Sequence, residues 1–263
     1  MYSSIYIRMT TRFQQLNIEN IAVGPTQDSS FIPSQRIAWI SSNTTNSSLL
    51  IQSPEFITET YGIPREGPFY TTDKSRAFYK MPFCHERHKH SDEIDDQQVE
   101  EFFMKLTELD QHFGSDEFKN KMFGEKNASK YEYQPIVRGL DQPDEEEEVV
   151  EEPENRPYRP PYIKVKIDLD YESGRPTCKV IDKSSGDRDN VKVNNFKDQT
   201  DHIRFMTKHR MVIHMNRLYS MKNQAGGEKR RYGIDLKLAA MECTNKTRKL
   251  ERTDSQFYDA FLD

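Results

Sequence analysis

Aromatic and basic residues alternate in one short stretch of the chain, and this mixture is suited to binding a nucleic acid. Between positions 69 and 83 the sequence combines rings with positive charges: Phe69, Tyr70, Lys74, Arg76, Phe78, Tyr79, Lys80 and Phe83. Cations attract the phosphates of any nucleic acid, and a planar ring can stack on any base. The stretch therefore predicts binding to single strands without sequence preference. The alternative is an amphipathic strand whose rings belong to the core.

A later part of the chain carries the remaining candidates on strand-like runs. Apolar and polar residues alternate strictly over 162–170, which predicts a strand with Ile163 and Val165 on its core-facing side. The runs 210–219 and 232–240 flank a basic loop with Gly226 and Gly227, which predicts a β-hairpin with a cationic tip. We expect the nucleic-acid contacts to come from these tyrosines and cations: Tyr79, Lys80, Tyr162, Lys164, Lys166, Arg210, Arg217, Tyr219, Lys229, Arg230, Arg231 and Lys237.

The charge is distributed unevenly along the chain. The net charge is −5, yet residues 161–252 contain 21 basic against 12 acidic residues, a net charge of +9. Residues 91–160 contain 8 against 21, a net charge of −13, and include an acidic run over 141–154. Self-repulsion predicts that this run is a solvated linker loop. The alternative is that the acidic run competes with nucleic acid for the basic surface.

The sequence offers little support for catalysis or a bound metal. It has no glycine-rich phosphate loop and no nucleophile elbow. Asp168 and Asp170 would suit a metal-dependent nuclease, but no further acid or lysine stands at a recognisable spacing. Cys84 and His88 are four residues apart, but a second pair with zinc-finger spacing is missing. We therefore predict no enzyme, no catalytic residue, no metal and no cofactor, with the nuclease as a distant alternative.

The elements that must position the candidate residues are mainly strands. Two runs around 36–40 and 48–52 flank a polar tract, which predicts a hairpin. Apolar residues at helical spacing predict one helix over 96–114, and a second short helix is expected over 116–123. Trp39, the only tryptophan, is expected to pack in the core or an interface, with a base-stacking platform as the alternative.

Cysteine use and hydropathy predict the compartment. The three cysteines, Cys84, Cys178 and Cys243, are too widely spaced for a disulfide framework, which favours a reducing intracellular location. We expect Cys178 and Cys243 to be ordinary strand residues. No apolar run approaches the ~18 residues of a membrane span, so no membrane association is expected.

Several short motifs resemble the single-stranded-DNA-binding proteins of nucleocytoplasmic large DNA viruses. They follow one another in the same order as in that family, from Ile37 to Thr244. The motifs are Ile51-Gln52-Ser53-Pro54 with Tyr61-Gly62-Ile63, Leu109-Asp110 with Met122-Phe123-Gly124, Pro160-Pro161-Tyr162-Ile163-Lys164-Val165-Lys166, and Arg231-Tyr232-Gly233-Ile234-Asp235-Leu236-Lys237-Leu238. Tyr219 stands where the family pattern has a tryptophan.

The resemblance implies a mainly β protein with an α insertion, an oligonucleotide-binding (OB) fold-like β-barrel. It implies sequence-independent binding of single-stranded DNA in viral DNA replication, recombination or repair, in the host cytoplasm or nucleus. We expect the chain to consist of an arm over 1–34, a domain over 35–250 with a helical insertion over 91–140, and an acidic, aromatic tail over 251–263. The acidic linker loop over 141–160 within this domain is not part of the family pattern. Replication proteins are expected to bind this tail through Phe257, Tyr258 and Phe261.

A different class of function fits the same basic surface. A viral structural or scaffold protein could present it to an acidic partner protein. Such a protein would show no preference for single strands over duplex DNA, so this preference separates the two interpretations. RNA as a ligand and a homo-oligomeric state are both left open by the sequence.

Overall fold

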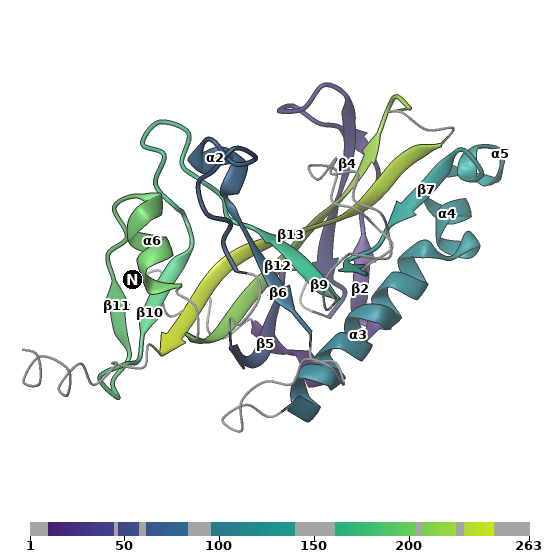
Figure 1. The fold of residues 1–263 in the computed structure, drawn as a ribbon. Helices are drawn as coiled ribbons and strands as arrows, with labels where there is room; N and C mark the ends of the chain where they lie inside the picture. Colours follow the sequence, from purple (N-terminus) through teal and green to yellow (C-terminus); the bar gives the residue numbers. More distant parts are fainter. Residues whose placement is uncertain are drawn as a thin grey trace, which may run out of the picture.

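A long antiparallel hairpin is the central element of the structure, which is a computed structural model describing residues 10–44, 47–57, 62–83, 96–139, 161–203, 207–224 and 229–244. Its strands are β12 (Lys208–Met221) and β13 (Arg230–Thr244), and they run through the middle of a 13-stranded sheet (Figure 1). Five of the other described strands pair directly with β12 or β13.

The other strands are shorter and lie on both sides of the hairpin. Their bounds are β1 (Thr10–Arg12), β2 (Ile21–Val23), β3 (Gln27–Asp28), β4 (Gln35–Ser42), β5 (Leu49–Ile57), β6 (Phe78–Pro82), β7 (Tyr131–Gln134), β8 (Val137–Arg138), β9 (Tyr162–Lys166), β10 (Lys179–Asp182) and β11 (Asp189–Val191). The helices are α2 (Asp73–Arg76), α3 (Asp96–Gly114), α4 (Asp116–Phe123), α5 (Glu125–Ala128) and α6 (Phe196–His202). Two 3-10 turns, η1 (Phe13–Gln15) and η2 (Ile18–Asn20), follow β1.

The sheet is mixed. Strand β5 pairs with the first part of β12, and β4 pairs with its last part. Strands β7, β9 and β10 pair in parallel with β13, on the side of β13 that faces away from β12. Strand β9 in turn pairs with β6 and β8. The sheet is open in the described part of the chain, because β1 pairs there only with β5 and β11 only with β10.

One side of the sheet is the core, and we call it the inner face. Along β12 the buried Met211, Ile213, Met215 and Leu218 point to this side, with register shifts after Val212 and Met215. Helix α3 packs against the inner face with its apolar stripe, Val99, Phe102, Leu106, Leu109 and Phe113. The hydroxyl of Tyr232 in β13 donates a hydrogen bond to the Phe113 carbonyl at 2.6 Å, which joins the helix to the hairpin. We call the opposite side of the sheet the outer face.

Several elements agree with the sequence analysis. The fold is mainly β, as predicted, and the two predicted helices are α3 and α4. The predicted hairpin is β12–β13, and the alternating run that begins at Tyr162 forms β9. The runs around Trp39 and Leu50 form β4 and β5, but these strands meet only at an isolated bridge between Ser41 and Ser48. Both strands pair instead with β12.

The segment before position 35 differs from the expected arm. From Thr10 onward it supplies β1, which pairs with β5, and β2 and β3, which pair with β4. Phe13 and Leu16 are buried in the core beside these strands. Apolar burial therefore joins this segment to the domain.

None of the described helices is long and apolar enough to cross a membrane.

The β12–β13 hairpin contains a glycine whose small size is required. A Cβ atom on Gly233 would lie 2.9 Å from the Tyr219 hydroxyl and 3.1 Å from the Gln134 carbonyl oxygen. Gly233→Ala should therefore destabilise the protein by about 1–3 kcal/mol, because the Tyr219 ring and strand β7 would have to move. Urea unfolding measures this, and Gly67→Ala, with nothing within 4 Å of the added Cβ, is the control. Equal stability of the two variants would contradict the packing.

Candidate nucleic-acid interface

The outer face brings together cations from several strands. Lys166 of β9 is the register partner of Lys237 in β13, and Lys164 is the partner of Lys80 in β6. Arg217 of β12 stands between Trp39 of β4 and Asp235 of β13. Because side chains alternate between the two sides of a strand, these pairings place the following predicted residues on the outer face: Lys80, Tyr162, Lys164, Lys166, Arg210, Arg217, Tyr219, Arg231 and Lys237.

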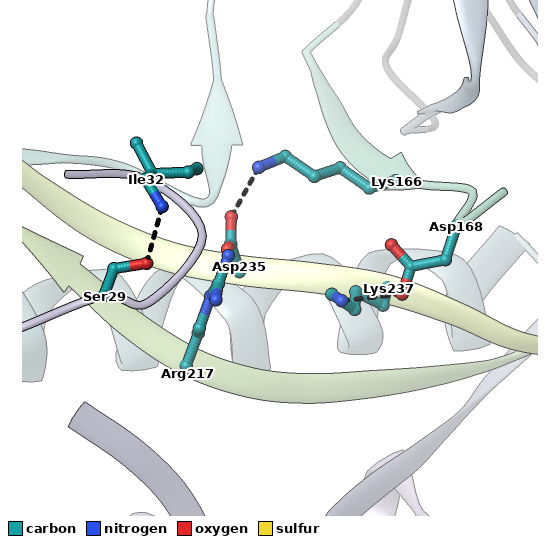
Figure 2. A network of polar contacts seen from close by, with 7 residues as sticks. All are labelled: Ser29, Ile32, Lys166, Asp168, Arg217, Asp235 and Lys237. Atoms are coloured by element: carbon teal, nitrogen blue, oxygen red, sulfur yellow. Dashed lines mark hydrogen bonds and ion pairs between the residues drawn. The ribbon is translucent and has the colours of Figure 1, made fainter. Parts of the chain in front are cut away.

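A buried carboxylate links two of these cations. Asp235 is only 3% exposed, and its two oxygens accept hydrogen bonds from Lys166 Nζ at 2.6 Å and Arg217 Nε at 2.8 Å (Figure 2). Burial alone would raise the pKa of Asp235, but the two cations outweigh it and hold the pKa below its usual value. The carboxylate is therefore charged at neutral pH, and the three groups together carry one net positive charge.

Three further ion pairs hold cations of the same face. Lys237 Nζ is 2.6 Å from Asp168 Oδ2, and Figure 2 shows this pair beside Asp235. Farther along β12, Lys208 and Arg210 both contact the Glu55 carboxylate, at 2.8 and 3.0 Å. These pairs fix the direction of the cationic side chains. An ammonium or guanidinium group has several N–H donors, so an ion pair leaves donors that can reach a phosphate.

At the β6–β9 edge the cations lie over rings. Lys164 Nζ is 4.0 Å from the centre of the Phe78 ring, and Lys80 Nζ is 5.0 Å from the centre of the Tyr162 ring. Tyr162 is only 7% exposed, so its ring supports Lys80 and does not offer an open surface to a base. The predicted stacking role of Tyr162 is therefore not compatible with its position.

Tyr79 has no place in the interface. It is 0% exposed on the inner face, where it packs against Phe56 and His209. A ring sealed in the core cannot stack on a base, so this prediction was wrong. The alternative stated for the 69–83 stretch, rings that belong to the core, applies to Tyr79, and the period of two places its neighbour Lys80 on the opposite side.

Two other rings take the place of those tyrosines. Trp39 is 50% exposed on the outer face next to Arg217, so it does not pack in the core, whereas packing in an interface and the base-stacking alternative stay predictions. The sequence could have predicted this exposure, because Ala38 and Ile40 form the apolar side of β4 and alternation places Trp39 on the opposite side. Tyr219 lies across Gly233, which has no side chain to lift the ring from the sheet.

The cations at the hairpin end do not all point the same way. Arg230 lies over the Tyr131 ring at 5.8 Å and its position alternates with that of Arg231, which puts Arg230 on the inner side. Lys229 is exposed at the start of the strand. The predicted tip itself, residues 225–228, lies outside the described residues. Lys229 precedes the strand and, after Lys119, helps to lower the pKa of Asp116 on α4, so of the three cations Arg231 remains the candidate for the outer face.

Other candidate residues have different surroundings. Asp168 pairs with Lys237, and Asp170 accepts hydrogen bonds from the Ser173 backbone N–H and hydroxyl, so both acids of the nuclease alternative have protein partners. The Cys84–His88 motif, the acidic run over 141–154 and the tail with Phe257, Tyr258 and Phe261 lie outside the described residues.

Comparison with known proteins points to a viral source. No family model matches the chain. A protein of Acanthamoeba polyphaga mimivirus, itself named as uncharacterized, is 26% identical over 221 residues, which cover 76% of this chain and 52% of the viral protein. The chain thus spans about half the length of the curated relative it matches. The similarity indicates an origin in a nucleocytoplasmic large DNA virus and assigns no activity.

Proposed function

We propose that this protein binds single-stranded DNA without sequence preference, through the outer face, during viral DNA replication, recombination or repair. The observation that carries the proposal is the shared location of the groups that such binding needs. Cations from β9, β12 and β13 lie on the same side of the sheet as the exposed Trp39 and the flat-lying Tyr219, whereas Lys80 of β6 is only 8% exposed on that side and is not counted among them. Phosphates would contact the cations, and bases would stack on the two rings.

The arrangement favours single strands over duplex DNA. Base–aromatic stacking requires an exposed base, and the bases of a duplex are already stacked on one another. The aromatic part of the face lies at β4 and the lysines Lys164 and Lys166 lie on β9, so a strand crossing the sheet would meet both. We further propose that the sheet is a variant of the OB architecture, which uses a curved sheet surface in this way.

The only tryptophan gives a direct test of this location. Trp39 is half exposed within the proposed site, so stacking of a base on its ring should change the intrinsic tryptophan fluorescence. Titration with oligo-dT should quench the signal to saturation, and a blunt duplex of equal length should bind much more weakly. An unchanged signal with oligo-dT under conditions where anisotropy shows binding would place the DNA elsewhere. Equal binding of the duplex would favour the scaffold interpretation.

Removal of the same ring should weaken binding. Trp39→Ala deletes one stacking platform, so the dissociation constant for labelled oligo-dT should rise roughly 10-fold, within the ~1–3 kcal/mol expected per stacked base. Fluorescence anisotropy of the labelled oligonucleotide measures the change. Met104→Ala removes an exposed apolar side chain from α3 and is the matched control, with unchanged affinity expected. Equal affinities of Trp39→Ala and the wild type would exclude stacking at this position.

A further inference from the structure

A second cluster of functional groups lies on the inner face, away from the proposed DNA site. It consists of Asp182 in β10, His202 at the end of α6 and Cys243 near the end of β13. One ligand atom from each of the three lies within 4.8 Å of the others. The sequence predicts that Cys243 is an ordinary strand residue. Nothing in the local sequence joins positions 182, 202 and 243.

The fold brings the three together through two pairings. Strand β10 runs parallel to β13, with Asp182 as the register partner of Cys243. Helix α6 packs on the same side of β10, where Gln199 Nε2 contacts Cys178 Sγ at 3.0 Å. His202 lies one helical turn beyond Gln199 and so reaches the far end of the strand, where Asp182 stands.

The distances in the cluster suit a shared metal ion better than a direct hydrogen bond. His202 Nδ1 is 3.6 Å from Asp182 Oδ2, beyond the usual ~2.7–3.2 Å for N–H···O. Zinc ligands at about 2.0–2.1 Å in a tetrahedron are separated by roughly 3.3–3.4 Å. Cys243 Sγ donates a hydrogen bond to the Ile181 carbonyl oxygen at 3.5 Å and lies within 4.8 Å of the other two ligand atoms. A small side-chain adjustment would therefore bring all three around one ion.

The carboxylate is already oriented for such a role. Asp182 Oδ1 accepts a hydrogen bond from the Ser184 backbone N–H at 2.8 Å and another from its hydroxyl. These bonds turn Oδ2 toward His202. Supporting hydrogen bonds of this kind commonly hold metal-ligating carboxylates in place.

The interior beside the cluster contains polar groups without partners. His209 is the cross-strand neighbour of Cys243 and is buried, and neither of its ring nitrogens has a hydrogen-bond partner among the described residues. The buried Gln199 Oε1 on α6 also lacks a partner there. Unpartnered buried groups are costly, and a functional site is one of the recognised reasons for their presence.

We propose that Cys243 Sγ, His202 Nδ1 and Asp182 Oδ2 bind a divalent transition metal of the zinc class. One sulfur, one nitrogen and one oxygen donor suit such an ion, whereas a thiolate disfavours calcium and magnesium. Three protein ligands leave the fourth tetrahedral position to water. The thiol proton is released on binding, and the ion joins α6 to the β10–β13 edge of the sheet.

Cobalt(II) titration tests the site, because a thiolate bound to Co²⁺ gives a charge-transfer absorption band. The chelator-treated full-length chain should carry the Cys84→Ser change, since Cys84 with His85, His88 and His90 is a competing source of thiolate and imidazole ligands. We expect one Co²⁺ per chain with a thiolate band, and loss of the band on addition of Zn²⁺. Absence of the band would overturn the proposal.

Single variants assign the ligands. In the same background, His202→Gln and Cys243→Ser should each abolish the band or weaken Co²⁺ binding by about 100-fold or more. Cys178→Ser replaces the other buried cysteine on this side of β10 and should retain full binding. Because His202 is partly exposed, His202→Gln should fold, and it decides the question if Cys243→Ser does not. Retention of the band in His202→Gln, or its loss in Cys178→Ser, would contradict the assignment.

Discussion

Replacing Asp235 with alanine should lower the free energy of unfolding by about 3 kcal/mol. The substitution removes the acidic partner that Arg217 has within the described part of the chain, and it leaves this mostly buried cation uncompensated. Loss of one member of a buried ion pair typically costs ~3–5 kcal/mol. We expect a loss at the lower end of this energy range, because Lys166, the second partner of Asp235, is half exposed and can turn toward water.

A neighbouring carboxylate provides the control for this effect. Asp168 also pairs with a lysine at 2.6 Å, but it is far more exposed than Asp235. Asp168→Ala should therefore cost no more than ~1 kcal/mol, as for surface ion pairs. Urea unfolding of both variants measures the difference. Similar losses for the two would mean that burial of Asp235 does not determine its contribution.

The effect of Asp235 should depend on pH in one direction. Its folded-state pKa lies below the unfolded value of about 3.9, because Lys166 and Arg217 together outweigh burial. A lowered pKa of an acid contributes stability that is fully present above the unfolded pKa and is lost as the pH falls through the folded pKa. The stability gap between wild type and Asp235→Ala should therefore narrow below about pH 4 and remain constant near neutrality.

Removal of three outer-face cations should weaken DNA binding strongly. The variant combines Lys164→Ala, Arg231→Ala and Lys237→Ala, which leaves the Asp235 ion pairs intact. Each lost phosphate contact lowers the salt slope for single strands by about 0.7, so three contacts correspond to roughly 50-fold weaker binding at about 0.15 M salt. Anisotropy titrations with labelled oligo-dT measure both the affinity and the slope.

A variant with the same loss of charge on the helices controls for net charge. Lys105, Lys121 and Lys197 lie on α3, α4 and α6, which pack on the inner face. Their combined replacement by alanine should change the affinity only slightly. If both triple variants weaken binding equally, overall charge and not the outer face would account for the interaction.

Local sequence patterns predicted the helices and the β12–β13 hairpin well, because residues close together in the sequence determine whether a helix or a hairpin forms. The spacing of Phe102, Leu106 and Leu109 predicted α3, and the alternation after Tyr162 predicted β9. The pairing of both β4 and β5 with β12 could not be predicted, because it joins distant parts of the chain. For the same reason the sequence does not predict the strands that residues 10–28 contribute to the sheet.

The candidate site was predicted in part. Alternation along β9 correctly separates Lys164 and Lys166 from the core residues between them. Tyr79 and Lys80 are adjacent on one strand, so a single face could not contain both, and this inference was available from the sequence. The role of Asp235 could not be inferred from the sequence, because its partners Lys166 and Arg217 are 69 and 18 positions away. Such contacts exist only once the sheet has formed.

The salt dependence of binding to single strands tests the central claim most directly. If at least five cations of the outer face contact phosphates, as we propose, a plot of log K against log salt for oligo-dT should have a slope of about −3.5 or steeper. A duplex of equal length should bind more weakly throughout the same salt range. A flat plot, or equal affinity for duplex and single strand, would contradict the assignment of the outer face as a single-stranded-DNA-binding surface.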